Sequence, residues 1–255
     1  MRKLFLLLTV PAIILSIGFS STGSSDEASF VREIVKKVDR LYRSRSSEAE
    51  VEMSIVTPNW ERQLRLKMWT EGLHKTFIHI LSPKKDAGIT TLRVGASMWN
   101  YFPKINKVIK VPPSMMMASW MGSDFTNDDL VKESSLLEDY DARSLPAEGN
   151  MPDYYFIELI PKKKTPTVWG KIMLVLRKED IIPVRQVFFD ERGEKIRVMH
   201  FSDIRKFGKR KIPATLELVS LKHKGKKTIL RYMEARFDTE VDDSIFTRRN
   251  LQKKR

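Results

Sequence analysis

The chain of 255 residues contains no cysteine. Disulfides and thiolate metal sites are therefore excluded, and so is a lipid anchor attached to a cysteine. A chain of this length can bury a substantial core. We therefore expect the fold to be held together by its apolar core alone.

Catalytic patterns are also lacking. Residues 95–99, Gly-Ala-Ser-Met-Trp, fail the G-x-S-x-G spacing, and no glycine-rich phosphate loop with a following Lys-Ser or Lys-Thr occurs. The four histidines are scattered along the chain. The sequence predicts a protein that is not an enzyme, with no catalytic residues, no cofactor and no metal site. An envelope hydrolase is the least favoured alternative, because it needs a polar triad that the sequence does not show.

Only one long apolar run is present, over residues 4–19. Arg2 and Lys3 precede it, and the small polar string SSTGSS follows. This order is typical of a secretory signal peptide, which we place at residues 1–23. An uncleaved membrane anchor is the alternative, but the run is shorter than the roughly 20 residues that a spanning helix needs, and it contains Pro11. We expect export, with residues 24–255 as a single domain.

Acidic residues are fewer than basic ones, 32 against 46, which gives a net charge of +14. Such a charge would permit nucleic acid as a partner, but an export signal argues against it. The basic residues are also dispersed: Arg65 and Lys67, for example, alternate with apolar residues. Two interpretations remain open, a solvated surface or attraction to anionic lipid head groups or an acidic membrane partner.

The periodicity of the sequence predicts one helix followed by many strands. From Ser24, apolar residues recur at helical spacing: Phe30, Val31, Ile34, Val35, Val38, Leu41 and Tyr42. The period then becomes two, which predicts strands near 51–55, 64–68, 74–81, 89–94, 99–102, 154–160, 168–177, 184–189, 195–201, 214–221 and 227–237. About ten or eleven consecutive antiparallel strands must curl into a barrel or split into a sandwich.

Residues 98–131 interrupt the strand pattern with an apolar, methionine-rich stretch. Methionine side chains are flexible and adapt to partners of varied shape. The stretch is either a loop that plugs the core or a mobile lid over a cavity. The acidic residues near its end, Asp124, Asp128, Asp129 and Glu133, could form a cation site. Spacing favours a plainer role, because Thr126 lies three residues before Asp129 and can cap a short helix.

Two segments of this stretch, SMWNYFPKINKVIKVPP and WMGSDFTNDDL, resemble the outer membrane lipoprotein-sorting protein family, relatives of the periplasmic lipoprotein carrier LolA. The resemblance covers nearly all of the chain after residue 23. The matching positions are Trp99, Tyr101, Pro103, Met121, Gly122, Ser123, Asp124, Phe125, Asp129 and Leu130. It implies a mainly β fold, an open half-barrel of about ten or eleven antiparallel strands with helices covering its concave face around an apolar cavity.

The resemblance also implies a function. It suggests a periplasmic carrier or chaperone that binds acyl chains of lipoproteins or lipids and moves them from the inner to the outer membrane. Its partners would be an inner-membrane transporter and an outer-membrane acceptor, and the protein itself a monomer. The residues that would line or cover the cavity are Trp99, Tyr101, Met115, Met116, Met117, Trp120, Met121 and Phe125, with Arg93 as the candidate latch of the lid. The alternative is an accessory module that docks on an inner-membrane lipid exporter of the RND/MMPL or ABC type.

Overall fold

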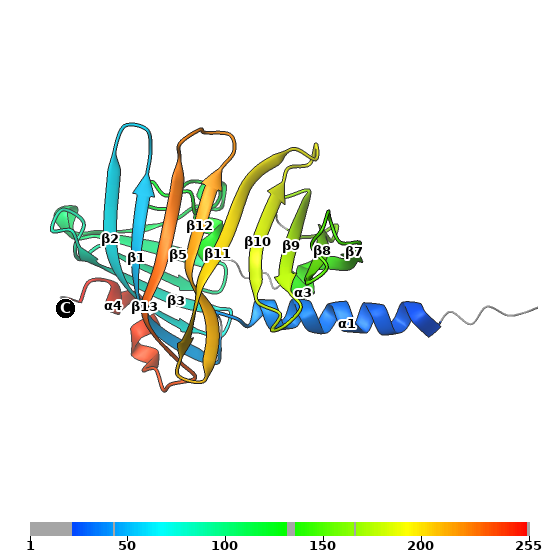
Figure 1. Ribbon diagram of the computed structural model, residues 1–255. Coiled ribbons are helices and arrows are strands. Elements are labelled where there is room, and N and C mark those ends of the chain that lie inside the picture. The colour runs from blue at the N-terminus through cyan, green and yellow to red at the C-terminus, as the bar shows by residue number, and fades with distance from the viewer. Residues whose placement is uncertain (1–21, 43, 132–135, 166, 254–255) are drawn as a thin grey trace, which may run out of the picture.

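The protein is built on one antiparallel sheet of thirteen strands (Figure 1). The computed structural model describes residues 22–42, 44–131, 136–165 and 167–253. The strand order is β6-β5-β4-β3-β2-β1-β13-β12-β11-β10-β9-β8-β7, so β6 and β7 form the two edges and the sheet is open. The strands are β1 (Ser46–Val56), β2 (Glu61–Glu71), β3 (Lys75–Ser82), β4 (Thr90–Val94), β5 (Ser97–Phe102), β6 (Lys107–Lys110), β7 (Tyr140–Leu145), β8 (Tyr154–Pro161), β9 (Lys171–Arg177), β10 (Pro183–Phe189), β11 (Lys195–Phe207), β12 (Arg210–Ser220) and β13 (Lys227–Phe237).

Alternation of side chains gives the sheet two distinct faces. On β2, Leu64 and Leu66 are fully buried, whereas Arg65 between them is exposed. The face that carries Leu64 and Leu66 belongs to the largest apolar cluster, and we call it the inner face. Strand β9 is buried on both sides, with Leu174 in the inner-face cluster and Val175 in a smaller cluster on the outer face. The core therefore lies mainly on the inner face.

Helices are few and mostly short. The longest, α1 (Thr22–Asp39), lies beside the β7 to β10 end of the sheet and buries Val31, Ile34 and Val35 in the inner-face cluster (Figure 1). The others are α2 (Asn127–Val131), α3 (Leu136–Asp139), α4 (Arg248–Leu251) and the 3-10 turns η1 (Pro103–Ile105), η2 (Pro113–Met115) and η3 (Asp243–Phe246). The apolar residues of η3 and α4 pack with Trp69 and Phe77 on the outer face.

The predicted mainly β, antiparallel architecture is confirmed, but the expected ten or eleven strands are too few. Two strands, β6 and β7, are missing from the predicted set. The sequence of β7, YDARSL, is polar and rich in residues that strands disfavour. This strand forms because β8 supplies a full ladder of partners. The expectation that helices cover a concave face stays a prediction. The proposed signal peptide lies almost wholly outside the described residues, and within them no helix is long and apolar enough to cross a membrane.

The close approach at Gly170 gives a test of this packing. A Cβ atom there would overlap the backbone carbonyl of Asp190, at the loop that joins β10 to β11. We expect Gly170→Ala to lower the free energy of unfolding by about 1–3 kcal/mol, because the backbone must shift to make room. Urea denaturation measures this.

The control for that experiment is Gly72→Ala. Gly72 has a φ of +52° but nothing within 4 Å of an added Cβ, so this variant reports backbone strain alone. Strain of that kind costs about 1 kcal/mol. A loss at Gly170 no larger than the loss at Gly72 would contradict the close packing of the two loops.

Candidate functional site

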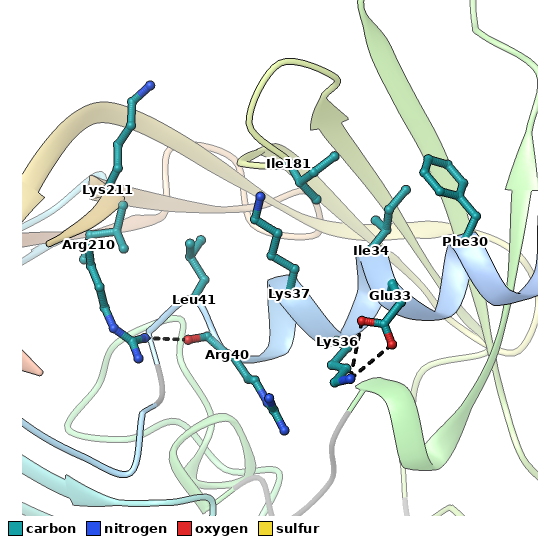
Figure 2. A pocket seen from close by; sticks show the side chains of 11 residues that line it. Phe30, Glu33, Ile34, Lys36, Lys37, Arg40, Leu41, Ile181, Arg210 and Lys211 are labelled. Carbon is teal, nitrogen blue, oxygen red and sulfur yellow. Dashed lines mark hydrogen bonds and ion pairs between the residues drawn. The ribbon is translucent and has the colours of Figure 1, made fainter. Parts of the chain in front are cut away.

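A groove of about 650 Å³ runs between α1 and the sheet (Figure 2). Phe30, Ile34 and Leu41 enter it from the α1 side, and Ile181 and Ile212 from the opposite wall. The first three are spaced by four and seven residues, so they follow one side of the helix and its final turn. The apolar stripe that fixes α1 on the sheet therefore continues into a wall that is left open. Glu33, Lys36, Lys37, Arg40, Arg210 and Lys211 complete the lining.

The wall opposite α1 holds an apolar side chain in an unusual backbone conformation. Ile181, in the turn between β9 and β10, has a φ of +60°. A β-branched residue rarely occupies the left-handed region, because its side chain crowds the backbone, and the cost is on the order of 1 kcal/mol. Two hydrogen bonds fix the turn: the Ile181 N–H donates to the Arg177 carbonyl at 3.0 Å, and the Arg177 N–H donates to the Ile182 carbonyl at 2.9 Å. The hydrogen-bonded turn thus holds Ile181 at the groove despite the strain.

The α1 side of the groove carries an excess of positive charge. Its single acid, Glu33, is paired with Lys36 at 3.1 Å (Figure 2). Lys37 and Arg40 are both exposed, and among the described residues neither forms an ion pair. Lys37 lies between Ile34 and Leu41 on the helical stripe, so its ammonium projects from an otherwise apolar wall (Figure 2).

On the opposite side, by contrast, the cations have carboxylate partners. Arg210 contacts Asp238 at 3.0 Å, and Lys211 contacts Asp180 at 2.8 Å. Burial alone would raise the pKa of Asp180, but the hydrogen bond from Lys211 and the charges of Arg177 and Lys211 outweigh it and lower that pKa. The pKa of Asp238 is lowered as well, because the hydrogen bonds from Arg210 and from the Arg45 backbone, together with the charges of both arginines, outweigh the desolvation. Both carboxylates therefore stay ionised at neutral pH and neutralise these two cations.

The methionine-rich stretch crosses the inner face, and we call residues 112–129 the strap. Its centre is Trp120, which is 1% exposed and donates from its indole N–H to the Thr91 hydroxyl of β4 at 3.2 Å. The next residue, Met121, accepts a hydrogen bond on its carbonyl from Arg62 of β2 at 3.1 Å. Two strands on one side of the sheet thus hold the middle of the strap.

The far end of the strap is held by charged groups. The Thr228 hydroxyl of β13 donates to the Asp124 carboxylate at 2.8 Å. Arg197 of β11 forms a two-pronged contact with Asp129, at 2.7 and 2.6 Å. The guanidinium packs against two adjacent rings, 4.4 Å from the centre of Trp169 and 4.2 Å from that of Phe188. Both partners are largely buried, so this is a desolvated ion pair whose cation packs against aromatic rings.

The structure separates the predicted site residues into three groups. Met116, Trp120, Met121 and Phe125 gather in the inner-face cluster. Met115 and Met117 are 50% and 37% exposed. Trp99 and Tyr101 point to the outer face, where they pack with Phe246.

The remaining predicted site residue is Arg93, the candidate latch. Arg93 is 1% exposed, and its Nε donates to the Gly95 carbonyl at 3.1 Å. None of the predicted site residues lines the groove. The signal that could have indicated the groove is Lys37, a charge set within the apolar stripe.

The acidic cluster has the predicted structural role. The Asp129 N–H donates to the Thr126 hydroxyl at 3.0 Å, and the Thr126 N–H donates to the Asp129 carboxylate at 2.8 Å, which is a capping box at the start of α2. Over the part of the chain that the structure describes, no three His, Asp or Glu side chains could hold a metal ion together. Glu133 lies outside the described residues.

Three solved bacterial structures illustrate the similarity of fold. They are a DUF1329 family protein from Desulfovibrio piger (TM-score 0.79, 21% identity, 89% of this chain and 99% of that one), a domain described as an outer membrane lipoprotein-sorting protein from Vibrio parahaemolyticus (0.76, 21%, 89% and 100%) and a LolA superfamily protein from Nitrosomonas europaea (0.72, 18%, 86% and 98%). The fold is therefore that of LolA-like proteins, and the resemblance predicted from the strap and its flanking strands is confirmed.

A family model matches most of the chain. The model is described as "-like: Uncharacterized protein" and matches residues 72–253. The chain belongs to that family. A comparison with curated proteins gave no match.

The pair between Arg197 and Asp129 predicts how firmly the strap is held. Removing one partner of a buried ion pair leaves the other charge uncompensated, which costs about 3–5 kcal/mol. We expect Arg197→Met to lower the free energy of unfolding by about that much and to make the strap accessible to protease. Urea denaturation and limited proteolysis measure the two effects.

The matched control is Lys227→Met, which breaks the ion pair with Glu217 on neighbouring strands. That pair is 40% and 34% exposed, so its loss should cost less than about 1 kcal/mol. The double variant Arg197→Met, Asp129→Asn should recover part of the loss. Equal effects in the buried and exposed pairs would show that Arg197 does not hold the strap.

Proposed function

We propose that this protein is an exported, non-enzymatic carrier that binds acyl chains of a lipoprotein or another lipid in the groove beside α1. The observation that carries the proposal is the groove itself, an apolar channel of about 650 Å³ on a LolA-like fold. Its volume lies within the roughly 300–1,000 Å³ that is usual for small-molecule sites. Transfer would take place in the periplasm, from an inner-membrane transporter to an outer-membrane acceptor.

The energetics of an open groove suit a carrier. A chain of about sixteen carbons gains roughly 0.8 kcal/mol per buried methylene, on the order of 12 kcal/mol in all before ordering costs. Because the groove is open, a chain in it would keep one side in water, and roughly half of that gain, about 6 kcal/mol, would be realised. Taken alone, this gain corresponds to a dissociation constant of about 40 μM, and the ordering costs weaken binding from there toward about 1 mM. Such binding is strong enough to retain a chain in transit and weak enough to release it.

The strap lies outside the lining of the groove and has a structural role. Trp120 and Phe125 are buried and tethered, so they serve as fixed core. Met115 and Met117 are exposed at the start of the strap but do not line the groove, so the proposal gives them no part in covering it. Arg197 provides a better supported latch than Arg93, because it bonds directly to the strap.

A second candidate function is docking on an inner-membrane lipid exporter. The observation that favours it is the edge strand β6, where all four residues are exposed and Val108 and Ile109 are 37% and 45% accessible. An exposed edge of this kind can accept a strand from another protein. A photo-crosslinking residue at Ile109 should then trap an exporter subunit in cells. Trapping of lipid alone, or of nothing, would exclude this candidate.

The carrier proposal predicts a specific loss of lipid binding. Delipidated protein should bind a fluorescent fatty acid saturably, at one or two sites. We expect Phe30→Ala to weaken this binding about tenfold, because the ring supplies much of the apolar wall and its loss removes roughly 1.5 kcal/mol of contact. A fluorescence titration gives the dissociation constants.

The control variant is Leu221→Ala. Leu221 is 46% exposed against 48% for Phe30, and it does not line the groove. It should bind as the unmodified protein does. Absence of saturable binding, or an equal loss in both variants, would refute the groove as the acyl site.

A further inference from the structure

We infer that the groove selects lipids whose head group carries a net negative phosphate, and that Lys37 and Arg40 bind that phosphate. This inference rests on the proposed carrier function and adds the class of ligand. It is based on the charges around the groove, where basic side chains outnumber acidic ones.

The first observation is the imbalance of charge along the lining. The groove has five cationic side chains and one carboxylate: Lys36, Lys37, Arg40, Arg210 and Lys211 against Glu33. A ligand that was apolar throughout would gain nothing from such a rim. A ligand with an apolar chain and an anionic end matches both parts of the groove.

The second observation separates neutralised cations from available ones. Carboxylates neutralise Lys36, Arg210 and Lys211, as described above. Lys37 and Arg40 have no ion-pair partner among the described residues, and both are exposed. The positive charge that an incoming anion can use is therefore concentrated on these two residues.

The third observation is the position of these two cations. Lys37 lies on the same helical side as Ile34 and Leu41, with its ammonium at the groove (Figure 2). The negative end of the helix dipole favours a cation in the last turn, but it does not select the side of the helix. Arg40 follows the last residue of α1, and its carbonyl accepts a hydrogen bond from Arg210 at 2.9 Å. That bond anchors the Arg40 backbone at the mouth of the groove. The Arg40 guanidinium points to the other side of the helix from the Lys37 ammonium (Figure 2), so this exposed side chain has to turn toward the groove to share an anion with Lys37.

Two lysolipids with the same acyl chain test the inference. The probes are lysophosphatidylglycerol, which is anionic, and lysophosphatidylcholine, which is zwitterionic, both below their micelle concentrations. One lysine or arginine near an anionic lipid surface strengthens binding about fivefold, so two should give a preference of roughly 10- to 30-fold. The preference should shrink in high salt, because the groove is open to screening.

The decisive variant is Lys37→Gln, Arg40→Gln. It should bind lysophosphatidylglycerol about as weakly as lysophosphatidylcholine, with the affinity for lysophosphatidylcholine unchanged. The matched control is Lys84→Gln, Lys85→Gln, which removes the same charge from an exposed loop outside the groove and should keep the preference. Glycerol 3-phosphate, the head group without a chain, should compete only at far higher concentration.

The outcomes separate this inference from the proposed function. Equal binding of the two lysolipids by the unmodified protein would overturn the inference and leave the carrier function intact. If the groove variant and the loop variant lost the preference for lysophosphatidylglycerol equally, the preference would come from the overall net charge. That result would also overturn the inference. Failure of both lysolipids to bind would overturn the carrier function itself.

Discussion

An open antiparallel sheet has an apolar inner face that the chain must cover with its own segments. Two segments do so here. Helix α1 packs Val31, Ile34 and Val35 against it, and the strap places Trp120 and Phe125 in the same cluster. Neither segment can be removed without exposing apolar surface, so both are structural before they are functional. The groove exists where the coverage by α1 is incomplete.

The pattern of the sequence was sufficient for the sheet but not for the site. Alternation on β2 and the capping box at Thr126 are local signals, and both appear in the structure as predicted. The ion-pair partner of Asp129 gives no such local signal. Arg197 lies 68 residues away in the sequence, and only the order of the strands brings the two side chains together. The faces of Trp99 and Tyr101 likewise depend on which side of the sheet the strap occupies. Local periodicity carries no information on either point.

The groove was missed for a related reason. Its walls come from α1, from the turn that holds Ile181 and from the start of β12, three segments that are distant in the chain. Only the lysine within the apolar stripe of α1 gave a local sign. The role of Lys37 at the edge of the groove depends on the opposite wall. Arg210 and Lys211 lie there, and carboxylates already neutralise both of them.

The edge strand β6 has a consequence for the protein's encounters with its own copies. A strand edge that accepts a foreign strand can also accept the same strand from a second molecule. In an antiparallel pairing of two β6 strands centred on Val108 and Ile109, Lys107 of each copy would stand opposite Lys110 of the other. Two such like-charge pairs oppose the association. The lysines at the ends of β6 thus disfavour self-pairing relative to pairing with a strand that brings acidic or neutral residues to those positions.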